Sequence, residues 1–258
     1  MTQAVRAKKH LGQHFLKDQN IAGAIVSALV EAYQTGAVLE VGPGMGVLTK
    51  YLLEQNSLTT WAAEVDSESI TYLHASYPHL SERLLNQSFL EINLSEKFTT
   101  GIAVIGNFPY NISSQIIFHI LDHRDAVPVM VGMFQKEVAE RIGAKNGGKE
   151  YGIISVITQA FYDVEYLFTV HEHVFDPPPK VKSGVIRMVR RKDELGCEEA
   201  LFRKVIKTAF NQRRKKLRNA ISVFGLSDEK LGEFATKRAE ELSVADFVAL
   251  TNLIAARE

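Results

Sequence analysis

A single cysteine, Cys197, occurs among the 258 residues of this chain. One cysteine excludes a disulfide framework and a zinc site built from cysteines, and it fits a reducing compartment. Long hydrophobic runs are also missing: the longest, such as residues 21–30, have about ten residues and are too short to cross a bilayer. No apolar signal core follows the basic residues near the N-terminus. We therefore expect a soluble, cytoplasmic protein without a membrane partner.

Net charge is absent as well, because 30 Lys and Arg residues balance 30 Asp and Glu residues. The charges are nevertheless segregated along the chain. Residues 201–220 contain eight basic residues and no acidic one, whereas residues 31–100 contain nine acidic and three basic residues. A basic run without acidic partners for i,i+4 pairs indicates contact with a polyanion more than a solvated helix face.

Strands and helices are expected to alternate from about residue 19 to residue 190. A helix over residues 19–33 is predicted to begin at Asp18, which is typical of an N-cap. Ser67 is expected to cap a later helix that extends towards Tyr77. Predicted strands then follow, with helices between them, at residues 37–41, 59–65, 83–86, 102–106 and 127–134. Such repeated strand–helix units predict a mainly parallel sheet with helices on both faces.

The pattern changes towards the C-terminus. Two β-rich segments, residues 162–170 and 184–189, flank a run of prolines and predict a closing hairpin. After residue 190 only helices are expected, and the last begins with a capping-box pair, Ser243 and Asp246. We therefore predict a domain over residues 1–190 and a small all-α domain over residues 191–258.

The segment Leu39-Glu40-Val41-Gly42-Pro43-Gly44-Met45-Gly46 predicts a strand that runs into a glycine turn and a helix. Gly42 and Gly44 let the backbone approach a ligand closely, and the helix N–H groups point towards it. Glu64 ends the next predicted strand, where an acidic residue can bind both hydroxyls of a ribose. The motif indicates a nucleotide-type cofactor and does not by itself identify it.

The spacing of the glycines narrows the choice of cofactor. A dinucleotide-binding fingerprint has the form G-x-G-x-x-G, and the position of its third glycine is Val47 in this chain. The observed G-x-G-x-G form, preceded by an acidic residue, is usual for S-adenosylmethionine methyltransferases. An NAD-dependent oxidoreductase remains as the second reading.

The tetrapeptide Asn107-Phe108-Pro109-Tyr110 follows a predicted strand at the edge where ligands bind in open α/β sheets. An exocyclic adenine amine is a poor nucleophile, because its lone pair is delocalised into the ring. The Asn107 amide oxygen and the Pro109 carbonyl could accept its two N–H bonds and orient the nitrogen towards a methyl donor. Tyr110 could stack on the base. The histidine pairs of the chain lack a third ligand at suitable spacing, so no metal site is expected.

Six segments together resemble the rRNA adenine N6-dimethyltransferase family, most closely its bacterial members that act on the small subunit. They are KHLGQHFL at 9–16, LEVGPGMGVLT at 39–49, NFPYNISS at 107–114, QKEVAERI at 135–142, FDPPPKVKS at 175–183 and NQRRKKLRN at 211–219. The resemblance implies a Rossmann-like α/β class I methyltransferase sheet with a small helical C-terminal domain. It also implies that S-adenosylmethionine is the cofactor.

The resemblance further implies dimethylation of two adjacent adenosines near the 3′ end of 16S rRNA, within the small (30S) ribosomal subunit. It assigns cofactor contacts to His14, Leu16, Gly42, Glu64, Ser88 and Asn107, and we add Gly44 from the glycine turn. It also suggests that Phe175 stacks on the target adenine opposite Tyr110, which completes a catalytic set with Asn107 and Pro109. The basic residues expected to contact RNA are Arg213, Arg214, Lys215, Lys216 and Arg218.

Two positions depart from the usual pattern of that family. His14 stands where Asn is common, and Ser88 stands where Asp usually accepts a hydrogen bond from the cofactor's adenine. A serine hydroxyl is a weaker acceptor than a carboxylate, so we expect weaker cofactor binding. Two alternatives stay open: a non-catalytic rRNA-binding assembly factor and a 23S rRNA adenine methyltransferase. The sequence contains no evidence of oligomerisation, and a monomer is expected.

Overall fold

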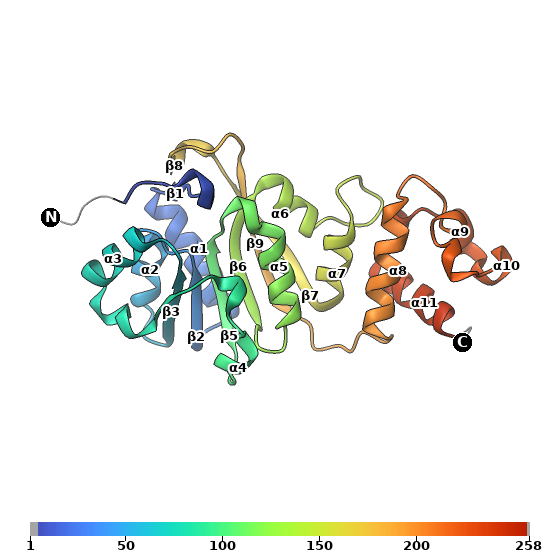
Figure 1. Ribbon diagram of the computed structural model, residues 1–258, viewed down its shortest axis with the longest axis horizontal. Coiled ribbons are helices and arrows are strands. Elements are labelled where there is room, and N and C mark those ends of the chain that lie inside the picture. The colour runs from blue at the N-terminus through green and yellow to red at the C-terminus, as the bar shows by residue number, and fades with distance from the viewer. Residues whose placement is uncertain (1–4, 257–258) are drawn as a thin grey trace. The chain divides into compact units, whose positions relative to one another are not determined.

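The computed structural model describes residues 5–256, and these form two compact units (Figure 1). The first unit contains the residues up to Ala139 and the segment Asp163–Arg190. The second contains the segment Glu140–Tyr162 and the residues from Arg191 onwards. The units thus divide at residue 190, where the change of sequence pattern predicts the boundary. They differ from the predicted division in residues 140–162, which group with the C-terminal helices and not with the sheet.

A seven-stranded sheet forms the first unit, with the strand order β4-β3-β2-β5-β6-β9-β7. Parallel pairing joins β4 (Leu84–Asn86), β3 (Leu58–Glu64), β2 (Gly36–Val41), β5 (Ile102–Asn107) and β6 (Val129–Gln135). The antiparallel partner of β6 is β9 (Ser183–Arg190), and β7 (Tyr162–Val170) is the edge strand beside it. The expected parallel sheet and closing hairpin are both confirmed.

Burial on both faces explains the apolar character of the central strand β5. All four residues from Ile102 to Ile105 are 0% exposed. Successive side chains of a strand point to opposite faces, and Ala103 and Ile105 belong to the core cluster that also contains Ile25 and Leu29. The latter two residues lie on α1 (Gln19–Ala32), which contacts α2 (Val47–Leu53), β6 and β9. Helix α1 therefore covers one face of the sheet.

Two of the three predicted helix caps are confirmed. Asp18 accepts hydrogen bonds from the backbone N–H groups of Asn20 and Ile21, as predicted for the N-cap of α1. Helix α3 (Ser67–Ser76) is capped by Asp66, and not by Ser67 as its sequence suggests. The predicted capping box is present at the start of α11 (Val244–Ala255), where Ser243 and Asp246 bond reciprocally.

The N-terminal segment, residues 8–16, contains two short regular elements. It contains a short 3-10 turn, η1 (Lys9–Leu11), followed by β1 (Phe15–Leu16). Strand β1 pairs antiparallel with β8 (Phe175–Asp176), the first residues of the proline loop, residues 175–180. Two segments about 160 residues apart in the chain are thereby held side by side.

The second unit is helical, as expected for the C-terminal part. Its helices include α7 (Ile153–Phe161), α8 (Glu199–Asn211), α9 (Leu217–Ala220), α10 (Asp228–Leu231) and α11. Helix α8 buries Phe202, Val205 and Ile206, spaced to lie on one helix face. The remaining α-helices in the described part of the chain are α4 (Leu94–Lys97), α5 (Ser113–Asp122) and α6 (Lys136–Ile142). No helix in residues 5–256 is long and apolar enough to cross a membrane.

Candidate active site

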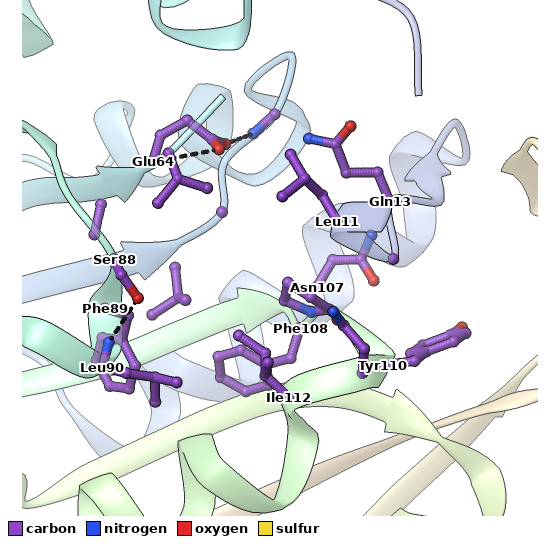
Figure 2. A pocket seen from close by; sticks show the side chains of 18 of the residues that line it. Leu11, Gln13, Glu64, Ser88, Phe89, Leu90, Asn107, Phe108, Tyr110 and Ile112 are labelled. Atoms are coloured by element: carbon purple, nitrogen blue, oxygen red, sulfur yellow. Dashed lines mark hydrogen bonds between the residues drawn. The ribbon is translucent and has the colours of Figure 1, made fainter. Parts of the chain in front are cut away.

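The parallel strands bring their carboxyl ends to one edge of the sheet, and a cavity lies along this edge. The glycine turn follows β2, Glu64 ends β3, Ser88 comes shortly after β4 and Asn107 ends β5. The N-terminal segment completes the lining with residues 11–15. In Figure 2, Leu11 and Gln13 of this segment face Ser88 and Leu90 across the cavity. Topology therefore assembles residues that are far apart in the chain.

Most of the predicted site residues line this cavity. The structure places there His14, Gly42, Gly44, Glu64, Ser88, Asn107, Pro109 and Tyr110. Leu16 and Phe175 are not part of the lining. The motifs found in the sequence thus converge on one place, with these two exceptions.

The glycines of the turn after β2 have positive φ angles, which favour glycine. At Gly42, which lines the cavity, a Cβ atom would have no neighbour within 4 Å, so a side chain there would enter open space. At Gly44 a Cβ would lie 2.8 Å from the ring of Phe15. Gly42 therefore keeps room for a ligand, and Gly44 lets the N-terminal segment pack against the turn.

Glu64 is 4% exposed and is held by backbone donors. Its Oε1 accepts from the N–H groups of Val65 and Asp66 at 2.9 Å, and its Oε2 accepts from Gly44 at 3.1 Å. Burial raises the pKa of the Glu64 carboxyl, and these hydrogen bonds oppose the rise. The N–H groups of Val65 and Asp66 use both lone-pair sites of Oε1, whereas Oε2 retains one site for a ligand. Glu64 is thus a fixed acceptor at the cavity wall, and Oε2 is its atom that can accept from a ligand hydroxyl.

Ser88 lies on the other side of the cavity from the N-terminal segment (Figure 2). Its hydroxyl accepts a hydrogen bond of 3.3 Å from the N–H of Leu90, at the start of the 3-10 turn η3 (Phe89–Glu91). The hydroxyl oxygen has one further lone pair for a ligand. Ser88 can therefore serve both as a helix cap and as a weak acceptor for an amine.

The side chain of Asn107 is anchored to the N-terminal segment. Its Nδ2 donates a hydrogen bond of 2.8 Å to the backbone carbonyl of His14. Because the amide nitrogen is committed in this way, the amide oxygen is the atom that can accept from a ligand. The orientation of the Asn107 side chain is thus fixed by His14, a residue 93 positions away in the sequence.

Pro109 and Tyr110 follow Asn107 in the short turn before α5. The Pro109 carbonyl already receives long hydrogen bonds from Ile112 N at 3.3 Å and Ser113 Oγ at 3.4 Å. The Tyr110 hydroxyl bonds to Ser183 Oγ on β9 at 2.6 Å. Burial raises the pKa of Tyr110, and the hydrogen bond with Ser183 opposes the rise. The phenol therefore stays neutral and anchored, while its ring lines the cavity.

The ring of Phe175, which the resemblance expects to stack on the target adenine, is 1% exposed and belongs to the hydrophobic core. Its pairing partner in β1 is Leu16, which is also a core residue and 4% exposed. Leu16 lines a small neighbouring cavity together with Glu40 and Asn107. These two apolar residues tie the proline loop to the N-terminal segment; neither side chain lines the main cavity.

A second cavity adjoins the first and shares Gly12, Gln13, His14 and Tyr110 with it. Its other walls come from the proline loop and from Gln135 at the end of β6. Its volume is about 430 Å³, which exceeds the lower limit of typical ligand pockets, about 300 Å³. The two cavities therefore adjoin each other, and Tyr110 lies in the wall that they share.

The predicted RNA-binding residues lie in the helical unit and differ in exposure. Arg214, Lys215, Lys216 and Arg218, named here the basic patch, are exposed. Arg218 lies 3.2 Å from Asp228. Arg213 is partly buried and donates to the carbonyl of Gly148 at 3.1 Å. Arg213 thus contacts another segment of its own unit.

Sequence reasoning missed three contributions to the site. Lys8 pairs with Asp66, Ser183 anchors Tyr110, and the side chain of His14 stacks on the Tyr110 ring. The KHLGQHFL segment, residues 9–16, is one of the motifs that the sequence analysis identifies. The residues that its side chains contact, however, follow only from the fold. Among the described residues, no cluster of three His, Cys, Asp or Glu side chains could hold a metal ion.

The family model described as ribosomal RNA adenine dimethylase matches residues 4–256 of this chain. The chain belongs to this family. Family membership confirms the predicted resemblance, the methyltransferase activity and S-adenosylmethionine as the cofactor. It is not compatible with the reading as an NAD-dependent oxidoreductase.

Curated relatives match over nearly the whole chain. The "Ribosomal RNA small subunit methyltransferase A" of Flavobacterium johnsoniae is 56% identical over 98% of both chains. The protein of the same name from Cytophaga hutchinsonii is 53% identical over 99% of this chain and 100% of its own length. This chain is thus similar in its full length to methyltransferases named for the small ribosomal subunit.

Solved structures confirm the fold. A dimethyladenosine transferase from Plasmodium falciparum has a TM-score of 0.77 at 24% identity, and covers 92% of this chain and 96% of its own. The 23S rRNA methyltransferase ErmE has a TM-score of 0.71 at 20% identity, and covers 93% of this chain and 99% of its own. The predicted fold, a Rossmann-like α/β sheet with a helical C-terminal part, is therefore confirmed.

Proposed function

We propose that this chain dimethylates the N6 amines of two adjacent adenosines near the 3′ end of 16S rRNA, within the small ribosomal subunit. The support is the 53–56% identity over nearly the full length to relatives named small subunit methyltransferases. The proposal also comprises action as a monomer in the cytoplasm. S-adenosylmethionine supplies, when bound, an electrophilic methyl group on its sulfonium sulfur.

The observation that carries the proposed chemistry is the anchored amide of Asn107. With Nδ2 bound to the His14 carbonyl, the amide oxygen can accept an N–H of the adenine amine. The Pro109 carbonyl is the second acceptor, since its bonds to Ile112 and Ser113 are long. Two fixed acceptors orient the amine nitrogen and let it become pyramidal towards the methyl donor.

Tyr110 provides the surface on which the target base stacks after it leaves the RNA helix. Its hydroxyl is bonded to Ser183, so the ring holds its position when the base enters. The second cavity, on the proline-loop side of Tyr110, is the proposed place for this base. No general base is needed before attack, because the amine loses its proton more easily once it is methylated.

The cofactor-binding assignments form part of the proposal. Gly42 leaves space for the cofactor at the turn, and Gly44 lets the N-terminal segment approach the turn closely. Glu64 accepts a hydrogen bond from a ribose hydroxyl, and Ser88 accepts one from the adenine amine. His14 contributes through its backbone, which holds Asn107. The helical unit would bind RNA phosphates through the basic patch. The sheet unit would thus serve catalysis, and the helical unit would serve RNA binding.

The decisive experiment measures transfer of labelled methyl groups to small subunits that lack the dimethyladenosines. We expect incorporation with the wild type and its loss in Asn107→Ala. Fully modified small subunits and large subunits serve as controls, and neither should be labelled. Labelling of large subunits would favour a 23S rRNA substrate. Tight binding to the unmodified small subunit without transfer would favour an assembly factor.

A further inference from the structure

The side chain of His14 connects the two segments that form the walls of the second cavity. Its ring stacks on Tyr110, with 5.4 Å between the centroids and 29° between the planes. Its Nδ1 lies 2.8 Å from the carbonyl oxygen of Pro177 in the proline loop. One residue thus contacts the tetrapeptide 107–110 on one side and the proline loop on the other.

Strand pairing explains why His14 lies opposite Pro177. In the antiparallel pair β1–β8, Phe15 is opposite Asp176 and Leu16 is opposite Phe175. The next position in this register pairs His14 with Pro177. Pro177 has no N–H, so it cannot continue the backbone ladder. The His14 ring bonds to the Pro177 carbonyl where the ladder ends.

The partner of Nδ1 also determines where the proton of the ring lies. A carbonyl oxygen only accepts hydrogen bonds, so Nδ1 of His14 must be the donor. The neutral ring is therefore the tautomer with hydrogen on Nδ1. This assignment can be observed directly, since the two ring nitrogens have different nitrogen chemical shifts in each tautomer.

We propose that His14 is a positioning residue that sets the gap between Tyr110 and the proline loop and thereby supports the second methyl transfer to each adenine. This inference rests on the proposed function, because it takes the second cavity as the site of the base. His14 and Tyr110 line both cavities, so the pair lies where the base would meet the cofactor.

The second methyl transfer depends more strongly on the walls of the second cavity than the first methyl transfer does, for a chemical reason. An unmethylated amine has two N–H groups, one each for the Asn107 oxygen and the Pro109 carbonyl. A monomethylated amine has only one, so it loses half of the hydrogen bonds that orient it. The stacking surface and the width of the cavity must then hold the base in place. A loose wall therefore affects the second step selectively.

Three variants separate the two interactions of His14. His14→Phe keeps an aromatic ring beside Tyr110 but has no donor for Pro177. His14→Asn keeps a possible donor but has no ring, and His14→Ala has neither. His10→Ala is the matched control, because His10 is exposed on the same segment and lines neither cavity.

The experiment follows both products, monomethyl- and dimethyladenosine, over time on unmodified small subunits at saturating S-adenosylmethionine. In His14→Phe and His14→Asn we expect the rate constant of the second transfer to fall about tenfold, equivalent to about 1.4 kcal/mol in the barrier. The loss in His14→Ala should be larger. The first transfer should fall less, so that monomethyladenosine accumulates, and the cofactor Kd should change less than about twofold.

Each alternative result has a defined meaning. Equal slowing of both transfers, or a matching loss of cofactor affinity, would overturn the positioning role and indicate general destabilisation. Wild-type product ratios in His14→Ala would overturn it as well, and so would a nitrogen spectrum with the proton of His14 on Nε2. If the wild type itself forms no dimethyladenosine on this substrate, the proposed function fails.

Discussion

Lys8 donates a hydrogen bond to the carboxylate of Asp66 and joins the N-terminal segment to the residue that caps α3. The backbone N–H of Asp66 in turn bonds to Glu64 in the cavity wall. The hydrogen bond with Asp66 raises the pKa of Lys8 against the effect of desolvation. Burial acts to raise the pKa of Asp66, but its bonds with Lys8 and Ser69 lower it overall. Both groups are therefore charged around neutral pH.

This pair predicts a role for Lys8 in cofactor affinity. Lys8→Met removes the hydrogen bond that holds the N-terminal segment against Asp66, next to Glu64. We therefore expect the cofactor Kd to rise about threefold to tenfold. Titration calorimetry measures the change. Lys9→Met is the control, since Lys9 is exposed and adjacent and the change in charge is the same. Equal affinities of the two variants would contradict the prediction.

The buried carboxyl of Glu40 predicts a pH-dependent stability. Burial raises its pKa to about 7, while the 2.5 Å hydrogen bond from Thr49 opposes the rise. The unfolded chain releases this proton near the ordinary glutamate pKa of 4.5, so the folded state binds more protons between the two values. Its contribution to stability is complete below this window and is lost as the pH rises through it, amounting to about 3 kcal/mol.

Replacement of Glu40 tests this linkage. Between pH 5 and pH 8, the free energy of unfolding of the wild type should fall by about 2.5 kcal/mol relative to Glu40→Gln, as measured by urea unfolding. Glu96→Gln is the control, because Glu96 is exposed. Parallel pH profiles of the wild type and Glu40→Gln would show that Glu40 is not the titrating group.

Ser88 predicts a gain of affinity on substitution. An aspartate in Ser88→Asp is a stronger acceptor for the adenine amine and can still cap η3 through the N–H of Leu90. We expect the cofactor Kd to fall about tenfold, the effect of roughly 1.4 kcal/mol. Calorimetry with S-adenosylmethionine and with the product S-adenosylhomocysteine measures it. An unchanged Kd would show that Ser88 does not face the adenine.

Phe175 is predicted to act through the core. Phe175→Ala leaves a cavity in the cluster that joins the proline loop to α1, and should reduce the free energy of unfolding by about 3–5 kcal/mol. Phe175→Leu, which keeps much of the volume, should lose far less. Urea unfolding measures both variants. Full stability of Phe175→Ala combined with slow methylation would instead support the stacking role expected from the resemblance.

The basic patch is predicted to bind RNA phosphates. Its replacement by four glutamines (Arg214→Gln, Lys215→Gln, Lys216→Gln and Arg218→Gln) should weaken binding to the small subunit. It should also reduce the slope of log affinity against log salt by about 0.7–0.9 for each phosphate that is no longer neutralised. Arg213→Gln should instead lower the stability of the helical unit, since Arg213 bonds to Gly148. An unchanged salt slope in the fourfold variant would refute RNA binding by the patch.

The elements of the fold were largely predictable from the sequence because they depend on local patterns. The strand–helix alternation and Asp18 indicated the sheet and the start of α1, and both are observed. The cap of α3 was assigned to the wrong residue, because Asp66 and Ser67 are both good N-caps and only the backbone course distinguishes them. The assignment of residues 140–162 to the helical unit depends on long-range packing that no local pattern encodes.

The sequence by itself determined the family, the methyl donor and the chemical groups at the end of each strand. These follow from residue types at fixed spacing, such as the glycine turn with Glu64 and the tetrapeptide from Asn107 to Tyr110. Tertiary structure alone decided which groups face each other. Strand pairing buries Phe175 in the core and places His14 between Tyr110 and Pro177. Such interactions join residues up to 163 positions apart, so they depend on how the whole chain packs.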